Sequence, residues 1–394
     1  MTKQLRRGTA VLLLLTVLCL LVACDDQRLS DDPVPTETDQ NATVRISAVG
    51  DIYLSEDQIE DARLADGSYN FMPQFSDVYA ALSKADLTIG NFEGNFAGAP
   101  YGQEHGSYPD EFAVALNDAG FDLLQTANSF SIYNGLAGLR RTKDVIENNG
   151  MLCSGTYRDA SERSDGQVTV FEFNGIRVAV LSFTKGLGGM SLPSGEEYCV
   201  DLLYTDYADD YEEIDEAGIT AAIDKAKRED PDVIIAMVHW GSENVLEVSK
   251  RQEQIADLMF HNGVDAILGS HPHLVAKVEQ RTVRMDDGSR KNVLIAYSLG
   301  DFCKVSRGQT NMSPILNLVF TRDAFSGETT LTGVSCSSVA VMDNGEEAPD
   351  RYTILDADNA IALYEGNYYD RITWDLYQSL LSKREYLLSV IGLS

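Results

Sequence analysis

The chain has 394 residues, of which 44% are hydrophobic, and this composition is typical of a globular protein. It carries 61 Asp and Glu residues against 31 Lys and Arg, for a formal net charge of −30. Such a charge argues against a nucleic-acid partner, because binding to nucleic acid depends on Lys and Arg neutralising phosphates. It also means that an anionic substrate would have to be captured locally, by a bound cation.

The N-terminus has the features of an exported lipoprotein. A short basic segment with Lys3 and Arg6 precedes an apolar run at residues 11–23, which is shorter than the roughly 20 residues that span a bilayer. The run ends in Leu-Val-Ala followed by Cys24, a sequence that resembles the lipobox of bacterial lipoproteins. We therefore expect residues 1–23 to be a signal peptide and Cys24 to be lipidated, placing the protein outside the cytoplasm on the cell membrane. An uncleaved anchor, or an ordinary signal followed by a chance cysteine, is the alternative.

Residues 24–41 are polar and acidic with two prolines, and they predict a flexible tether. No linker follows, so residues 42–394 are expected to form one domain. Cys153, Cys199, Cys303 and Cys336 allow two disulfides in any of three pairings, or four buried thiols.

Short apolar runs alternate with helix-like segments along this domain. The runs predict buried strands, and apolar residues at three-to-four spacing predict helices. Asn174 and Gly175 join two of the strands as a β-hairpin, and Asn262-Gly263 ends one of the helices. The pattern indicates an α/β domain with a sheet covered on both faces. The predicted strands are residues 43–49, 85–89, 121–127, 167–173, 176–183, 232–238, 264–268, 293–297, 315–320 and 329–335, and the predicted helices are residues 112–119, 136–148, 219–228, 253–260 and 374–389.

Five of the strand-like runs end in a side chain that can bind a metal. Ligands of open α/β sheets bind at the carboxyl ends of the strands, so these side chains are expected to converge. Each alone has an ordinary explanation as a turn or cap residue, but three of the five histidines beside carboxylates point to a divalent-metal site. Mixed imidazole and carboxylate donors suit Zn, Mn or Fe. The predicted ligands are Asp51, Glu93, Asn128, His239, His271 and His273.

Two histidines flanking Pro272 in the segment Gly-Ser-His-Pro-His are the strongest single signal. His239 emerges directly from a buried strand, where an unpartnered imidazole would be costly. For His105 and His261 we expect no role at the metal. Asn91 and Glu243, which lie beside predicted ligands in the sequence, are predicted substrate contacts.

These motifs, in this order, resemble the CapA-type poly-γ-glutamate capsule biosynthesis family, a relative of the calcineurin-like metallophosphoesterases. The resemblance covers residues 44–320 and implies a four-layer α/β/β/α sandwich with one or two divalent ions. It implies a role in synthesis or export of a capsule or exopolymer, with an anionic polymer or phosphoester substrate and a membrane complex as partner. The resemblance also implies catalytic roles for His239 and His271. The matching segments are residues 50–51, 90–94, 239–243, 269–273 and 297–302.

The chain also departs from the family pattern. The segment that normally reads Asn-Asn-His continues here from Asn128 to Phe130, and Tyr133 holds the position of a following aspartate. Tyr53 stands where classical phosphoesterases have a histidine. The missing histidine would act on the transferring group or the leaving oxygen, and loss of a general acid removes a factor of about 10²–10⁴ in rate. Two functions therefore stay open: a metal-dependent hydrolase, and a non-catalytic component of a capsule assembly. A lipid-anchored solute-binding protein is a third, weakened by the absence of a two-lobed repeat.

Overall fold

Two β-sheets face each other in the structure, a computed structural model that describes residues 41–165, 168–285, 287–304, 311–370 and 372–393. These residues form one compact unit. The predicted signal peptide, Cys24 and almost all of the predicted tether lie outside the described residues. The first sheet runs in the order β13 (Tyr352–Asp356), β12 (Thr329–Asp343), β11 (Met312–Arg322), β1 (Ala42–Ile52), β2 (Leu87–Phe92), β3 (Leu123–Gln125), β4 (Leu152–Ser154). The second runs β5 (Thr169–Phe173), β6 (Ile176–Thr184), β7 (Val233–His239), β8 (Ala266–Ser270), β10 (Arg290–Ala296), β9 (Val278–Arg284).

The main core lies between the two sheets. In β1 the alternate residues Val44, Ile46 and Ala48 are fully buried and pack in one cluster with residues of β6 and β7, such as Val178 and Ile235. This period-two pattern is that of strands that bury one face against a second sheet. Each fully buried Val or Ile side chain contributes about 1.5–3 kcal/mol.

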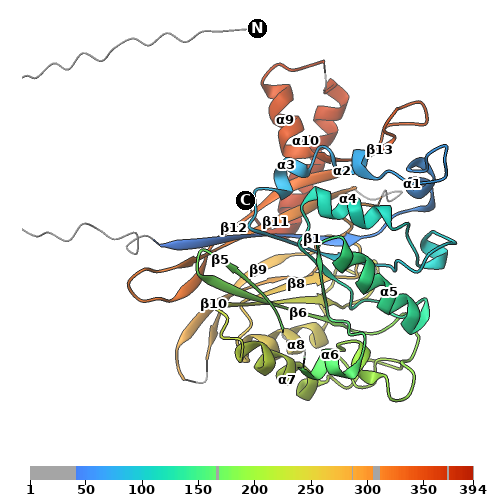
Figure 1. The fold of residues 1–394 in the computed structure, drawn as a ribbon. Helices are drawn as coiled ribbons and strands as arrows, with labels where there is room; N and C mark the ends of the chain where they lie inside the picture. The colour runs from blue at the N-terminus through green and yellow to red at the C-terminus, as the bar shows by residue number, and fades with distance from the viewer. Residues whose placement is uncertain (1–40, 166–167, 286, 305–310, 371, 394) are drawn as a thin grey trace, which may run out of the picture. The chain divides into compact units, whose positions relative to one another are not determined.

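Helices cover the outer face of each sheet. The first sheet is covered by α4 (Glu111–Ala119) and α5 (Gly135–Asn148), and the second by α7 (Glu216–Lys227) and α8 (Lys250–His261). The buried positions of α8 include Ile255, Ala256 and Met259, which is the three-to-four spacing of an amphipathic helix. The four-layer α/β/β/α order is thereby confirmed (Figure 1). The single sheet expected from the residue pattern alone is wrong, because buried strands of two stacked sheets have the same periodicity as those of one.

The remaining helices are mostly short and surround these layers. Near the C-terminus, α9 (Ala357–Glu365) and α10 (Trp374–Ile391) form a pair that packs on β11 and β12. The predicted closing helix is thus confirmed; Thr373 caps its start and Gly392 ends it in a left-handed conformation. The others are α1 (Glu56–Asp61), α2 (Met72–Phe75), α3 (Tyr79–Leu82), α6 (Ala160–Asp165) and the 3₁₀ turns η2 (Gln103–His105) and η3 (Glu197–Cys199).

Two local predictions are settled by the structure. The β5–β6 hairpin is confirmed, and Asn174 and Gly175 have the φ values of 53° and 78° that its two-residue turn requires. Of the two alternatives for the cysteines, the structure has free thiols: Cys153, Cys199 and Cys303 are buried and Cys336 is partly exposed. Within the described ranges, no helix combines the length and apolar character needed to cross a bilayer.

Candidate metal centre

Both sheets contribute to one cluster of polar side chains. Asp51 lies in β1 and Glu93 directly follows β2, whereas His239 ends β7 and His271 directly follows β8. β1 and β2 are parallel, as are β7 and β8, so their carboxyl ends bring these side chains to the junction of the two sheets. Nearly all of the cluster is buried: Asp51, Asn128 and His239 have no exposed surface, Glu93 is 3% exposed and His271 7%, while His273 is partly exposed.

A close backbone approach fixes Asp51 at this junction. The N–H of Asp51 donates to Gly300 O at 2.8 Å, and Phe302 N–H donates to Asp51 O at 2.9 Å. A Cβ on Gly50 would lie 1.9 Å from Gly300 O, so only glycine permits the contact. The β1–β2 pairing also shifts register between Ala48 and Asp51, the kind of irregularity that reorients a side chain next to a site.

The first group of donors consists of Asp51, Glu93 and His273, each offering a ligand atom within 4.8 Å of the others. His273 Nδ1 lies 3.4 Å from Asp51 Oδ2 and 4.0 Å from Glu93 Oε2. Asp301, which was not predicted, accepts a hydrogen bond from the same nitrogen at 2.9 Å. Three carboxylates therefore face one imidazole.

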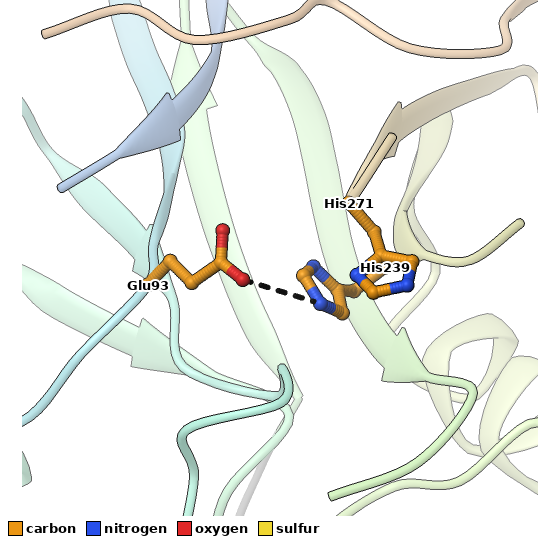
Figure 2. Close-up of side chains that lie close together, drawn as sticks. All are labelled: Glu93, His239 and His271. Carbon is orange, nitrogen blue, oxygen red and sulfur yellow. Dashed lines mark ion pairs between the residues drawn. The ribbon is translucent and has the colours of Figure 1, made fainter. Parts of the chain in front are cut away.

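The second group consists of Glu93, His239 and His271, again within 4.8 Å (Figure 2). His239 Nε2 lies 3.7 Å from Glu93 Oε1, and the rings of the two histidines are 4.5 Å apart between centroids. Ser270 Oγ lies 3.2 Å from the other nitrogen of His239 and fixes the orientation of the ring. Glu93 belongs to both groups, so one carboxylate has an oxygen for each of two adjacent metal positions.

The loop after β8 is strained where it presents its histidines. His271 has φ 92° and His273 has φ 59°, on either side of Pro272. Residues other than glycine rarely adopt positive φ angles of this size, and backbone strain of this kind is concentrated at functional sites. The predicted pairing of these two histidines around a proline is what the structure shows: one joins each donor group.

Two atoms of the cluster fit a metal ion because no described residue forms a hydrogen bond with them. Glu93 Oε2 and His271 Nδ1 are buried polar atoms without a hydrogen-bond partner. Such atoms are costly in a protein interior unless a ligand satisfies them. Carboxylate oxygens and imidazole nitrogens are the donors that Zn, Mn and Fe accept, and the cluster can bind a metal ion with them.

The protonation states of the three histidines also fit a metal-binding site. Burial, reinforced by the positive charges of His273 and Lys185, lowers the pKa of His271 to about 4, and burial also holds the pKa of His239 well below its usual range. Both imidazoles are thus neutral at pH 7, as metal ligands must be. Burial opposes protonation of His273 too, but its hydrogen bonds to Asp301 and Asp51 and the charge of Glu93 raise its pKa to about 12. In the absence of metal, a proton on His273 is the positive charge that the carboxylates hold.

The predicted asparagines lie beneath this cluster. Asn91 donates from Nδ2 to Asp51 Oδ1 at 2.7 Å, and its Oδ1 accepts from Asn128 Nδ2 at 3.1 Å. Asn128 Oδ1 accepts from Phe130 N, which leaves it one lone pair for a metal. Asn91 is 1% exposed, and its hydrogen bonds position Asp51 and Asn128. Its predicted contact with substrate stays a prediction.

Three positions depart from a known pattern: Phe130 and Tyr133 from that of the family, and Tyr53 from that of the classical phosphoesterases. Tyr53 donates its hydroxyl hydrogen to Asp301 at 3.2 Å and so borders the first donor group. Phe130 packs its ring against Tyr133, at 5.2 Å between centroids, and supplies no proton donor. Glu243 is exposed; burial is the main cause of the raised pKa of Glu93, and the charge of Glu243 adds to it. Its predicted contact with substrate is likewise left as a prediction.

Asp301, Ser129 and Lys185 were missed by the sequence analysis. Asp301 follows β10, which runs parallel to β8, so the strand-end rule applied to that run would have found it. Ser129 Oγ lies 3.1 Å from His239 Nε2, and a lone serine in a loop carries no sequence signal for that contact. The backbone N–H of Lys185 donates to His239 O, and this contact depends on the pairing of β6 with β7.

Known proteins share this chain's sequence features. The family model described as "Bacterial capsule synthesis protein PGA_cap" matches residues 45–306. The "Capsule biosynthesis protein CapA" of Bacillus anthracis is 27% identical over 313 residues, which are 76% of this chain and 69% of that protein. The "PGA biosynthesis protein CapA" of Bacillus subtilis (strain 168) is 24% identical over 273 residues, or 65% of this chain and 62% of that protein. The match thus spans less than two thirds of the B. subtilis protein.

Solved structures align more weakly. A phosphatase from Mycoplasma pneumoniae aligns with 76% of this chain and 95% of its own, at 14% identity and a TM-score of 0.44. A putative 5′-nucleotidase from Staphylococcus aureus aligns with 78% of this chain and 56% of its own, at 16% identity and a TM-score of 0.45. TM-scores below 0.5 at such low identity say nothing about the chemistry of this chain.

Proposed function

Because this chain belongs to the bacterial capsule synthesis protein PGA_cap family, we propose that it is a cell-envelope protein of capsule or exopolymer synthesis or export that uses a divalent-metal site on an anionic substrate. The observation that carries the metal is the pair of unsatisfied buried atoms, Glu93 Oε2 and His271 Nδ1, among the convergent donors. Asp51, Glu93 and His273 would hold one ion, and Glu93, His239, His271 and Asn128 a second.

A bound divalent ion would supply a Lewis acid for a phosphoryl or acyl oxygen and lower the pKa of a water. The protein's own part is to orient and to keep the site dry. Asn91 and Ser270 fix Asp51 and His239 through the hydrogen bonds given above, and the neutral imidazoles leave their lone pairs free. In the metal-free protein Asp301 holds His273 by accepting a hydrogen bond from Nδ1, and this nitrogen would have to lose its proton before it could bind an ion.

Metal analysis tests this proposal directly. Purified protein from cells supplied with Mn or Zn is expected to carry one or two equivalents of transition metal, measured by elemental analysis. His239→Ala is expected to lose at least half of it, since the variant removes a ligand from a buried group. His261→Ala, which alters an exposed histidine at the end of α8, serves as the control and keeps its metal. Wild-type protein without stoichiometric metal would refute the proposal.

The proposal includes export and lipid anchoring at Cys24, with a membrane complex of capsule synthesis as partner. Its support is the basic segment, the apolar run and the small residues before the cysteine. Growth with a clickable fatty acid is expected to label the wild type and not Cys24→Ser. Equal labelling of both would contradict the anchor.

A second candidate is a non-catalytic, polymer-binding component of a capsule assembly. The observation in its favour is Phe130, an aromatic ring at the position where the family pattern has histidine. The metal would then serve for structure or for holding anionic groups of the polymer.

A further inference from the structure

Lys185 lies at the edge of the metal centre. It follows the last residue of β6, where Thr184 is in register with His239 of β7. The backbone N–H of Lys185 donates to His239 O at 2.8 Å. Its main chain is therefore fixed beside a predicted ligand by sheet pairing, and the loop that it starts returns to the cluster: a Cβ on Gly188 would lie 3.0 Å from Ser129 O.

The side chain of Lys185 has no anionic partner. Its Nζ donates to Gly241 O at 2.7 Å and lies 4.5 Å from the centroid of the Tyr211 ring. Among the residues that the structure describes, no carboxylate oxygen lies within 4.0 Å of it. In contrast, the buried Nζ of Lys143 is 3.4 Å from both Glu147 and Glu162.

The unpaired ammonium of Lys185 is partly buried. The chain has about twice as many acidic as basic residues, and a partly buried charge is costly without a counter-ion. The hydrogen bond to Gly241 O holds this cation against the segment that directly follows His239.

We propose that Lys185 Nζ binds an oxyanion of the substrate at the metal centre, as a positioning and specificity group. The proposal rests on the proposed function, because it concerns the substrate of the same site. An ammonium donates strong, charge-assisted hydrogen bonds to phosphoryl and carboxylate oxygens. It would neutralise part of the anionic charge of the substrate in a protein whose net charge repels such groups.

Oxyanion binding is measured by calorimetry with inorganic phosphate and, separately, glutarate, on metal-loaded and metal-free protein. Lys185→Gln is expected to weaken binding about 10-fold or more, since it removes a charged donor. Lys185→Arg keeps the charge and is expected to stay within about threefold of the wild type. A larger loss for phosphate identifies a phosphoryl ligand, and a larger loss for glutarate identifies a carboxylate of a polymer.

Lys277→Gln is the matched control. Lys277 also lies over a tyrosine ring, at 5.0 Å from the centroid of Tyr297, but it is exposed and paired with Glu279. Metal content and melting temperature are recorded for every variant. Lys185→Gln that keeps its metal and its oxyanion affinity would overturn the assignment of Lys185. Wild type that takes up no metal would refute the proposed function alone, because the same comparison on metal-free protein still decides the role of Lys185.

Discussion

Glu93→Gln is expected to lower metal affinity at least about 100-fold, because Glu93 is the one side chain that belongs to both donor groups. Even changes to groups that only support a ligand cost about 10–100-fold in metal affinity. Wild-type protein at a metal concentration of 100 times its Kd should gain about 2.7 kcal/mol of stability, and the variant should lose this gain. Thermal melts with and without metal, together with a metal titration, provide the measurement.

The melting temperature of metal-free Glu93→Gln distinguishes the loss of a metal ligand from the loss of the fold. Burial, followed by the charge of Asp51, raises the pKa of Glu93 well above its ordinary value. A raised carboxyl pKa means that the folded state loses stability as the pH rises from the unfolded-state pKa toward the folded-state one. The neutral Gln avoids this loss, so at pH 7 the metal-free variant should melt no lower than the wild type. Glu243→Gln makes the same change at an exposed carboxylate and should keep its metal affinity within about threefold.

Retention of wild-type metal affinity by Glu93→Gln would contradict the shared-carboxylate interpretation. If the metal-free variant melts well below the wild type, its metal loss is a folding defect. His271→Ala then becomes the informative variant, since His271 is a ligand of the second group only.

Phe130→His is expected to raise the turnover of a generic aryl phosphate ester by about 10-fold or more, measured with metal bound. The reason is that a positioned general acid contributes about 10²–10⁴ in rate, and part of this should return with the imidazole. The segment is already held close to the cluster, because Phe130 N donates to Asn128 Oδ1 and Ser129 Oγ contacts His239.

Tyr133→His places the same side chain three residues away, at a position that is 44% exposed, and should cause no increase. No increase in Phe130→His, with metal content unchanged, would contradict the hydrolase and favour the polymer-binding component. If turnover of the aryl ester increased in both variants, the added imidazole would be acting without a defined position.

Much of the fold and the cluster could be predicted from sequence because strand-end positions carry the signal. Asp51, Glu93, His239 and His271 each follow or end a run of buried residues, and parallel strands bring such positions to one edge. The division of these residues between two sheets could not be read from the runs. A period of two shows that a strand has a buried face, but not which strand covers it. The family resemblance supplied the four layers.

The elements that were missed carry weak local signals. β4 has three residues, too few for a periodic pattern. In β9 exposed polar residues alternate with only partly buried ones, and two of the partly buried residues, Glu279 and Arg281, are charged. Lys185 was missed for a different reason. The surroundings of its ammonium group cannot be read from the sequence. They consist of Gly241 O and the ring of Tyr211, which are distant from Lys185 in the sequence and contact it only in the folded chain.

Each donor group draws on both sheets, with Asp51 and Glu93 from one and the histidines from the other. An ion in either position would therefore be a cross-link between the two halves of the sandwich, joining segments as far apart in the chain as Asp51 and His271. Between those two residues the protein itself supplies a single hydrogen bond, from His271 N to Asp51 Oδ2 at 3.2 Å. Loss of the ion would weaken this link between the carboxyl edges of the sheets, and amide hydrogen exchange would rise first in the loops after β2 and β8.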